Sequence, residues 1–383
     1  MSPLPGRPPA VTARPAEDAG AGTLRAGERP RIAGLDVARG LAVLGMFGAH
    51  LGPTADLGGD PSTWGAVVEG RSSILFATLA GVSIALLSGG ARPVEGAALG
   101  RARTRVLVRA AWVFAIGGVL EVLSTFVAII LGVYAVLFVL ALPFLRWPPG
   151  RLLLLAAGIA VAGPFAVVEV GQYATARDEA SSPFVLLSTT GSYPALVWWA
   201  FVLVGLAVGR LDLGAARVRL ALVAGGTAAA VLGYLGGWVT AGLAGRGRRL
   251  EGLRIGFRRE DAWDPAWFAG AQPHSGTPFE LIGSCGVAVA VIGVCLVLAD
   301  RLPRVTYPVA AVGALALSVY TAQIVAIWLL DLPFAPGWDV WARFTVTALV
   351  VATAWRLRMG RGPLERLLTW SSHRAAGPEP SAP

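Results

Sequence analysis

The chain has 383 residues, of which 55% are hydrophobic and only 14% charged, and its mean hydropathy is +0.65. Soluble globular proteins carry about 25% charged residues, so this composition argues against a water-soluble enzyme and indicates an all-α integral membrane protein. The net charge of +9 comes from arginine alone, because the sequence has no lysine. In a membrane protein such an excess is typical of cytoplasmic loops and does not indicate a nucleic-acid partner.

The first 30 residues are rich in proline, alanine, glycine and arginine and lack the apolar core of a signal peptide. We expect residues 1–30 to form a disordered cytoplasmic tail and residues 31–359 to form the transmembrane domain. Residues 360–383 are expected to be a cytoplasmic C-terminal tail.

A membrane-spanning helix needs about 20 apolar residues. Ten stretches meet this requirement, and we expect a polytopic protein of about ten transmembrane helices. They are residues 34–52, 72–89, 105–122, 125–145, 151–170, 193–210, 218–242, 278–299, 306–330 and 338–356. Arginines concentrate in alternate connections and acids in the others, which places both termini in the cytoplasm.

One connection departs from this pattern. Residues 243–277 carry six arginines on the side that the count makes extracytoplasmic. Long loops follow the charge rule less strictly than short ones, so we expect an extracytoplasmic loop with an interfacial or re-entrant segment. A miscounted helix is the alternative.

The first expected helix carries three ionisable side chains, Asp36, Arg39 and His50, in the sequence GLDVARGLAVLGMFGAHLGP. At about 100° per residue all three share one stripe, with His50 about 16 Å beyond Arg39 along the axis. Asp36 and Arg39 are spaced to form an ion pair, and imidazole exchanges protons near neutral pH. Ionisable groups inside a membrane mark functional sites by default, so the stripe is a candidate catalytic site. The alternative treats the pair as interfacial anchors.

Further polar side chains fall at both ends of the expected helices. Arg71, His274 and Glu280 are expected at the same extracytoplasmic level as His50, where together they would bind or orient a hydroxyl or amine acceptor. The alternative is that they are ordinary boundary residues that do not contact one another. Tyr320 and Gln323 lie within the ninth stretch and either line a substrate pocket or join helices through hydrogen bonds.

Two arginines at the cytoplasmic end of the third stretch are candidate cofactor ligands. Arg105 and Arg109 share a helix face, and guanidinium groups suit phosphates, so we expect them to bind the diphosphate of coenzyme A. The two cysteines, Cys285 and Cys295, are about 15 Å apart on a helix and cannot pair with each other. No metal-ligand spacing appears, so no metal is expected.

The stretch RIAGLDVARGLAVL, residues 31–44, resembles the start of the transmembrane acyltransferase superfamily. It is most similar to the bacterial branch of the heparan-alpha-glucosaminide N-acetyltransferase family and to the YeiB-like membrane proteins. The resemblance continues in GRSSILFATLAGVSIAL, PHSGTPFELIGSCG, GALALSVYTAQ and GPLERLL, and so covers most of residues 31–370. In the members that O-acetylate surface polysaccharides, an Asp, an Arg three residues later and a catalytic His eleven residues after the Arg open the first helix. Asp36, Arg39 and His50 match that spacing.

The heparan-type enzymes instead carry their catalytic histidine in the first extracytoplasmic loop, shortly before a W-x-G-like turn. Here Trp64 and Gly65 are present, but Pro61 stands at roughly the place of that histidine. Either His50 carries the chemistry or the protein has lost acyl transfer.

The resemblance implies a multi-pass plasma-membrane (inner-membrane) acyltransferase. It would move an acyl group, expected to be acetyl, from cytoplasmic acetyl-CoA to a hydroxyl or amine of an envelope glycan or small polar acceptor. Arg39 and Arg109 would hold the coenzyme, His50 would deprotonate the acceptor and Asp36 would fix Arg39. The alternatives are a transporter or channel for a polar solute and a non-catalytic envelope-assembly protein, with homo-oligomerisation left open.

Overall fold

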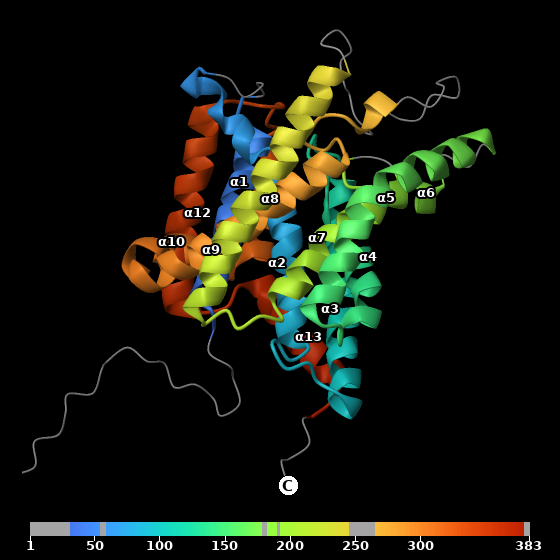
Figure 1. The fold of residues 1–383 in the computed structure, drawn as a ribbon. Coiled ribbons are helices and arrows are strands. Elements are labelled where there is room, and N and C mark those ends of the chain that lie inside the picture. The colour runs from blue at the N-terminus through green and yellow to red at the C-terminus, as the bar shows by residue number, and fades with distance from the viewer. Residues whose placement is uncertain (1–30, 54–58, 178–181, 190–191, 245–264, 379–383) are drawn as a thin grey trace, which may run out of the picture. The chain divides into compact units, whose positions relative to one another are not determined.

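The computed structural model describes residues 31–53, 59–177, 182–189, 192–244 and 265–378. The expected tail at residues 1–30 and most of the expected loop at residues 243–277 lie outside the described residues. The chain divides into two units, Met1–Ile32 and Ala33–Pro383, and all the described helices belong to the second. Within the described ranges every regular element is a helix (Figure 1), which confirms the all-α prediction.

The helices follow one another along the chain with mostly short connections. They are α1 (Ala33–Leu51), η1 (Pro61–Val68), α2 (Arg71–Leu87), α3 (Gly96–Val122), α4 (Leu131–Ala141), η2 (Leu142–Phe144), α5 (Pro149–Ala176), α6 (Pro183–Thr189), α7 (Ala195–Val208), α8 (Ala216–Leu243), η4 (Pro265–Phe268), α9 (Pro278–Arg301), α10 (Pro303–Ala314), α11 (Ala316–Leu329), α12 (Trp338–Met359) and α13 (Pro363–Ala376). Each of the ten expected stretches contains a helix, but the ninth bends by 71° between α10 and α11.

The number of helices suited to span a membrane is smaller than ten by length and composition. Among the described residues four segments qualify, and the bent pair α10–α11 makes a fifth if it is one span. The four segments are Thr63–Leu87, Pro149–Ala174, Ala216–Leu243 and Pro278–Arg301. The other expected spans fall short because α4 and α7 are brief and because α1, α3 and α12 carry charged side chains. The apolar helices make this a membrane protein.

We name the two ends of the helical unit after residues at the two ends of α1. We call the end near Arg39 the arginine end and the end near His50 the histidine end. α12 starts at the histidine end, where the Gly337 amide donates a hydrogen bond of 2.9 Å to the Leu51 carbonyl. The long helices run alternately between these two ends (Figure 1).

Glycines let neighbouring helices approach backbone to backbone. A Cβ added to Gly205 of α7 would lie 1.8 Å from the Thr78 carbonyl oxygen of α2. A Cβ added to Gly233 of α8 would lie 2.3 Å from the Gly283 nitrogen of α9. Small residues at such contacts are typical of helix packing in membranes. The face of α8 that carries Gly233 therefore packs against α9 of the same chain and is not open to a separate protein.

Arg210, directly after α7, joins three segments at the arginine end. Its guanidinium donates to the carbonyls of Ala85, Ser88 and Gly90 at 3.1, 3.4 and 2.8 Å, and to that of Leu145. The side chain is 5% exposed, and these four carbonyl oxygens surround its charge. These bonds satisfy the free carbonyls at the end of α2 and tie α2 to the end of the α4–η2 segment.

The segment after residue 359, expected only to be a tail, contains the helix α13, which packs against α3. Glu365 of α13 accepts hydrogen bonds from the backbone amides of Leu317 and Ser318 at 2.9 and 3.1 Å. It also accepts one from the Ser318 hydroxyl at 2.6 Å. A carboxylate at a helix N-terminus satisfies free amides and opposes the helix dipole, so α13 supports the start of α11 beyond the α10–α11 bend.

Candidate active site

The stripe of α1 faces the protein interior. Asp36 is 6% exposed, and Arg39 donates to its carboxylate at 2.8 Å and to the Ser83 hydroxyl of α2 at 3.1 Å. A Cβ added to Gly313 would lie 1.8 Å from the Asp36 carbonyl oxygen, so α10 presses closely against α1 at this level. The ion pair predicted from the spacing is present, and it is held between α2 and α10.

His50 lies at the other end of the stripe, one residue before α1 ends. Its Nδ1 is buried and has no hydrogen-bond partner among the described residues. The Gln323 amide of α11 faces the imidazole, but neither its Oε1 nor its Nε2 has hydrogen-bonding geometry to any described residue. Gln323 is only 2% exposed. A buried polar atom left without a partner costs about 1–3 kcal/mol, so this pair is suited to receive a polar ligand.

His274 reaches the same region from the loop before α9. Its imidazole lies within electrostatic range of that of His50. Its Nδ1 is 3.1 Å from the Ser192 carbonyl oxygen, and because a carbonyl only accepts, the proton of the neutral ring sits on Nδ1. Nε2 is then the basic nitrogen, and it faces the start of α2, where a Cβ on Gly70 would lie 3.6 Å from it.

Two aromatic rings fix the orientation of the His274 ring. Trp198 stacks on it with the centroids 6.3 Å apart and the planes inclined by 13°. Tyr193 meets it edge-on at 5.5 Å. An imidazole with one nitrogen hydrogen-bonded and two aromatic rings packed against it presents its other nitrogen in a defined direction.

Glu280 orients His274 through the backbone of the loop. Its carboxylate accepts hydrogen bonds from the His274 and Gly276 amides at 2.5 and 2.6 Å and from the Ser275 hydroxyl at 3.2 Å. The Thr277 hydroxyl in turn accepts from the Glu280 amide at 3.1 Å, which caps α9. His274 has a φ of 60°, a strained value that these bonds stabilise. Glu280 thus holds the main chain of the loop that carries His274.

The remaining candidates at the histidine end differ in their surroundings. Arg71 donates to the Tyr234 hydroxyl at 2.8 Å and lies within electrostatic range of Glu280. Tyr320 is 3% exposed, and its hydroxyl has no partner with hydrogen-bonding geometry among the described residues. A chain of neighbours thus links Arg71 to Glu280, His274, His50 and Gln323.

Several residues of this region were not identified from the sequence. They are Tyr134 and Tyr193, which lie within electrostatic range of each other and of the predicted Tyr320, and Tyr134 donates to the Ser73 carbonyl at 2.9 Å. The only signal for Tyr193 is its place in an aromatic-rich stretch, SYPALVWW, that opens α7. Such a stretch is equally typical of a membrane boundary.

The arginine end carries a cluster of guanidinium groups. Arg109 of α3 lies within electrostatic range of Arg105, Arg39 and Arg361, the last from the α12–α13 connection. The Nε of Arg109 is buried without a hydrogen-bond partner, and no described carboxylate forms an ion pair with Arg109. Mutual repulsion among these cations is relieved by a bound anion, and guanidinium groups suit phosphate oxygens. Arg361 was not predicted, because it follows the last apolar stretch.

No group of three or more His, Cys, Asp or Glu side chains within the described ranges is arranged to hold a metal ion. Cys285 and Cys295 are both free thiols in α9.

A comparison with family models matches residues 31–239, more than half of the chain, to the model described as heparan-alpha-glucosaminide N-acetyltransferase, catalytic. The comparison with curated proteins gives no match. The matched range contains the stripe of α1 together with Arg71, Arg105 and Arg109. His274, Glu280, Tyr320 and Gln323 come from beyond it.

Proposed function

The chain belongs to the heparan-alpha-glucosaminide N-acetyltransferase catalytic family, and from that premise we propose a membrane acetyltransferase that works across the bilayer. It takes the acetyl group from cytoplasmic acetyl-CoA and transfers it to a hydroxyl or amine of an envelope glycan or related acceptor. The observation that carries this proposal is the separation of two clusters along α1, cations at one end and imidazoles at the other.

The donor binds at the arginine end. Arg105 and Arg109, with Arg39 and Arg361, hold the phosphates of coenzyme A through charge-assisted hydrogen bonds. The proposal places this end in the cytoplasm, with ten crossings and both termini inside, in the plasma membrane. The alternation of helix direction and the distribution of arginine support that topology.

The acceptor binds at the histidine end. His50 removes the proton from the acceptor hydroxyl or amine as that atom attacks the thioester carbonyl. The new acyl–oxygen or acyl–nitrogen bond forms, the carbon–sulfur bond breaks, and coenzyme A leaves as the thiol after taking up a proton. Gln323 positions the acceptor beside His50, and His274 presents Nε2 to the same region. Arg71 and Tyr320 complete the polar surroundings.

The proposal is tested in proteoliposomes with radiolabelled acetyl-CoA outside and extracted envelope glycan inside, using the fraction of molecules whose arginine end faces the donor. The wild type should label the glycan, and His50→Ala should lower the rate by about 10²–10⁴-fold, the usual contribution of a general base. His373→Ala is the matched control, because His373 is exposed on α13. Unchanged labelling in His50→Ala removes His50 from the mechanism, and saturable glycan uptake without any donor indicates a transporter instead.

A further inference from the structure

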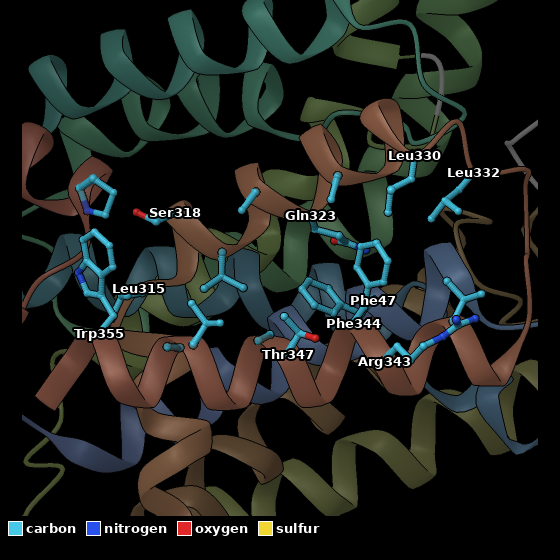
Figure 2. A pocket seen from close by; sticks show the side chains of 18 residues that line it. Phe47, Leu315, Ser318, Gln323, Leu330, Leu332, Arg343, Phe344, Thr347 and Trp355 are labelled. Atoms are coloured by element: carbon cyan, nitrogen blue, oxygen red, sulfur yellow. The ribbon is translucent and has the colours of Figure 1, made fainter. Parts of the chain in front are cut away.

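A groove that the reaction described above does not use runs between α11 and α12 (Figure 2). Its volume is 650 Å³, within the range of about 300–1,000 Å³ typical of ligand sites. Nearly all of its lining is apolar, with Phe47, Val319, Leu330, Phe344, Val351 and Trp355 among the side chains. Gln323 was expected from the sequence either to line a pocket or to join helices, and the rest of the lining, which comes from α1, α11, α12 and α13, was not predicted.

The groove opens on a surface suited to hydrocarbon. Large apolar side chains are exposed beside it on both helices, for example Leu329 of α11 at 67% and Val350 of α12 at 62%. In a membrane such positions face lipid chains. A molecule already dissolved in the bilayer therefore reaches the groove sideways, without passing through water.

One buried polar side chain points into the groove. Gln323 lines it, is 2% exposed, and leaves both amide atoms without a partner among the described residues. The same amide faces the imidazole of His50. Gln323 lines the groove (Figure 2), so the groove and the candidate catalytic base meet at this residue.

The long axis of the groove follows α12. Arg343 and Leu330 line it toward the histidine end, and Ser318 and Trp355 line it toward the arginine end (Figure 2). The twelve helical steps from Arg343 to Trp355 span about 18 Å at the helical rise of about 1.5 Å per residue. That length covers more than half of a hydrocarbon core about 30 Å thick, as one lipid chain does.

We propose that this groove binds the hydrocarbon chain of a lipid-anchored acceptor, whose hydroxyl or amine reaches Gln323 and His50 from the side. The inference rests on the proposed acyl transfer and adds the class of acceptor. An outer-leaflet amphiphile has its polar group at the histidine end and its chain directed toward the arginine end, which is the direction of the groove. The acyl chain of the donor fits less well, because a chain in the groove would place the thioester near Ser318, away from His50.

The first test compares two acceptors with the same sugar, dodecyl glucosaminide and methyl glucosaminide, in nanodiscs with labelled acetyl-CoA. Wild-type protein should acetylate the dodecyl compound with a KM at least tenfold lower. Ala348→Trp fills the groove and should raise that KM at least tenfold, while turnover of methyl glucosaminide changes less than twofold. Val350→Trp adds the same ring on the lipid-facing side of α12 and should leave both acceptors unchanged. Equal effects of Ala348→Trp on both acceptors overturn the proposal.

The second test reads binding without catalysis. A dodecyl glucosaminide with a diazirine in its chain is photolysed with the wild type, and labelled peptides are identified by mass spectrometry. Labels should fall on the groove-facing residues of α11 and α12, and Ala348→Trp should lose most of them. Labels on other parts of the protein would overturn the groove as the lipid-binding site, even if acetyl transfer occurs. Labelling of the groove without any acetyl transfer would support the lipid site and contradict the proposed enzymatic function.

Discussion

At the scale of single residues, the candidate site is defined by polar atoms that the fold leaves without partners. Most buried polar atoms in proteins are hydrogen-bonded, so a cluster of exceptions requires an explanation. Here the exceptions include His50 Nδ1, the Tyr320 hydroxyl and both amide atoms of Gln323. Arg71, Glu280 and His274, by contrast, make defined hydrogen bonds to protein groups and hold the surroundings in place.

The unpartnered amide of Gln323 predicts opposite effects on stability and activity. Gln323→Leu replaces a buried amide, which faces the His50 imidazole without hydrogen-bonding geometry, with an apolar group of similar size. The change removes a desolvation cost of about 1–3 kcal/mol. We therefore expect the thermal midpoint in detergent to stay level or rise, while acetyl transfer falls at least tenfold. A clear drop in the midpoint would show that the amide has a structural partner and would remove it from the site.

The sequence predicted the stripe of α1 and put Arg71, His274 and Glu280 at the level of His50, but it did not predict which groups contact one another. Helical periodicity relates residues a few turns apart, so the Asp36–Arg39 pair and the alignment of His50 follow from spacing alone. The contact of His274 with Ser192 joins positions 82 residues apart, and no local pattern reports it. The same holds for Arg361, which lies within electrostatic range of Arg109 although the two are far apart in the sequence.

At the scale of helices, apolar length predicted where each segment lies along the chain. Each of the ten expected stretches contains a helix, because a run of about 20 apolar residues has few other stable conformations in lipid. Hydropathy carries no information on direction, so the 71° bend between α10 and α11 was not predicted. The helix α13 was missed because its polar, amphipathic sequence gives no membrane signal.

Close backbone contact between α2 and α7 leaves no room for a side chain at Gly205. Gly205→Ala would place a methyl group 1.8 Å from the Thr78 carbonyl oxygen, and backbone cannot yield as a flexible side chain does. We expect a loss of about 1–3 kcal/mol in unfolding free energy, as for other overpacked cores, measured by denaturation in mixed micelles. Gly225→Ala in α8 is the control, because nothing lies within 4 Å of the added carbon. The control should be neutral or more stable by up to about 1 kcal/mol from helix propensity. Equal effects would contradict the packing described.

At the scale of the whole molecule, the two ends to which the proposal assigns donor and acceptor are joined by one helix. α1 carries Arg39 near its start and His50 at its end, about 16 Å apart by the helical rise. Each end is completed by residues from distant parts of the chain, Arg109 and Arg361 at one and Gln323 and His274 at the other. A charged coenzyme and a membrane-borne acceptor can thus bind from opposite sides without sharing a surface.

This arrangement predicts that coenzyme binding is electrostatic and restricted to the arginine end. Acetyl-CoA should raise the thermal midpoint of the wild type, since a ligand at 100 times its Kd stabilises the folded state by about 2.7 kcal/mol. S-acetylpantetheine, which lacks the phosphates, should not. Arg109→Gln should abolish most of the shift, whereas Arg103→Gln, an exposed arginine on the same helix, should keep it.

Added salt at 0.5 M should weaken the wild-type shift, because the Debye length falls to a few ångströms at such concentrations, about 3 Å at 1 M. A separate measurement tests which face of the membrane binds acetyl-CoA. Labelled acetyl-CoA should be captured by inside-out membrane vesicles and not by right-side-out ones, since only the former expose the arginine end if both termini are cytoplasmic. Capture by right-side-out vesicles would reverse the topology, and a shift that survives in Arg109→Gln would move the coenzyme away from the guanidinium cluster.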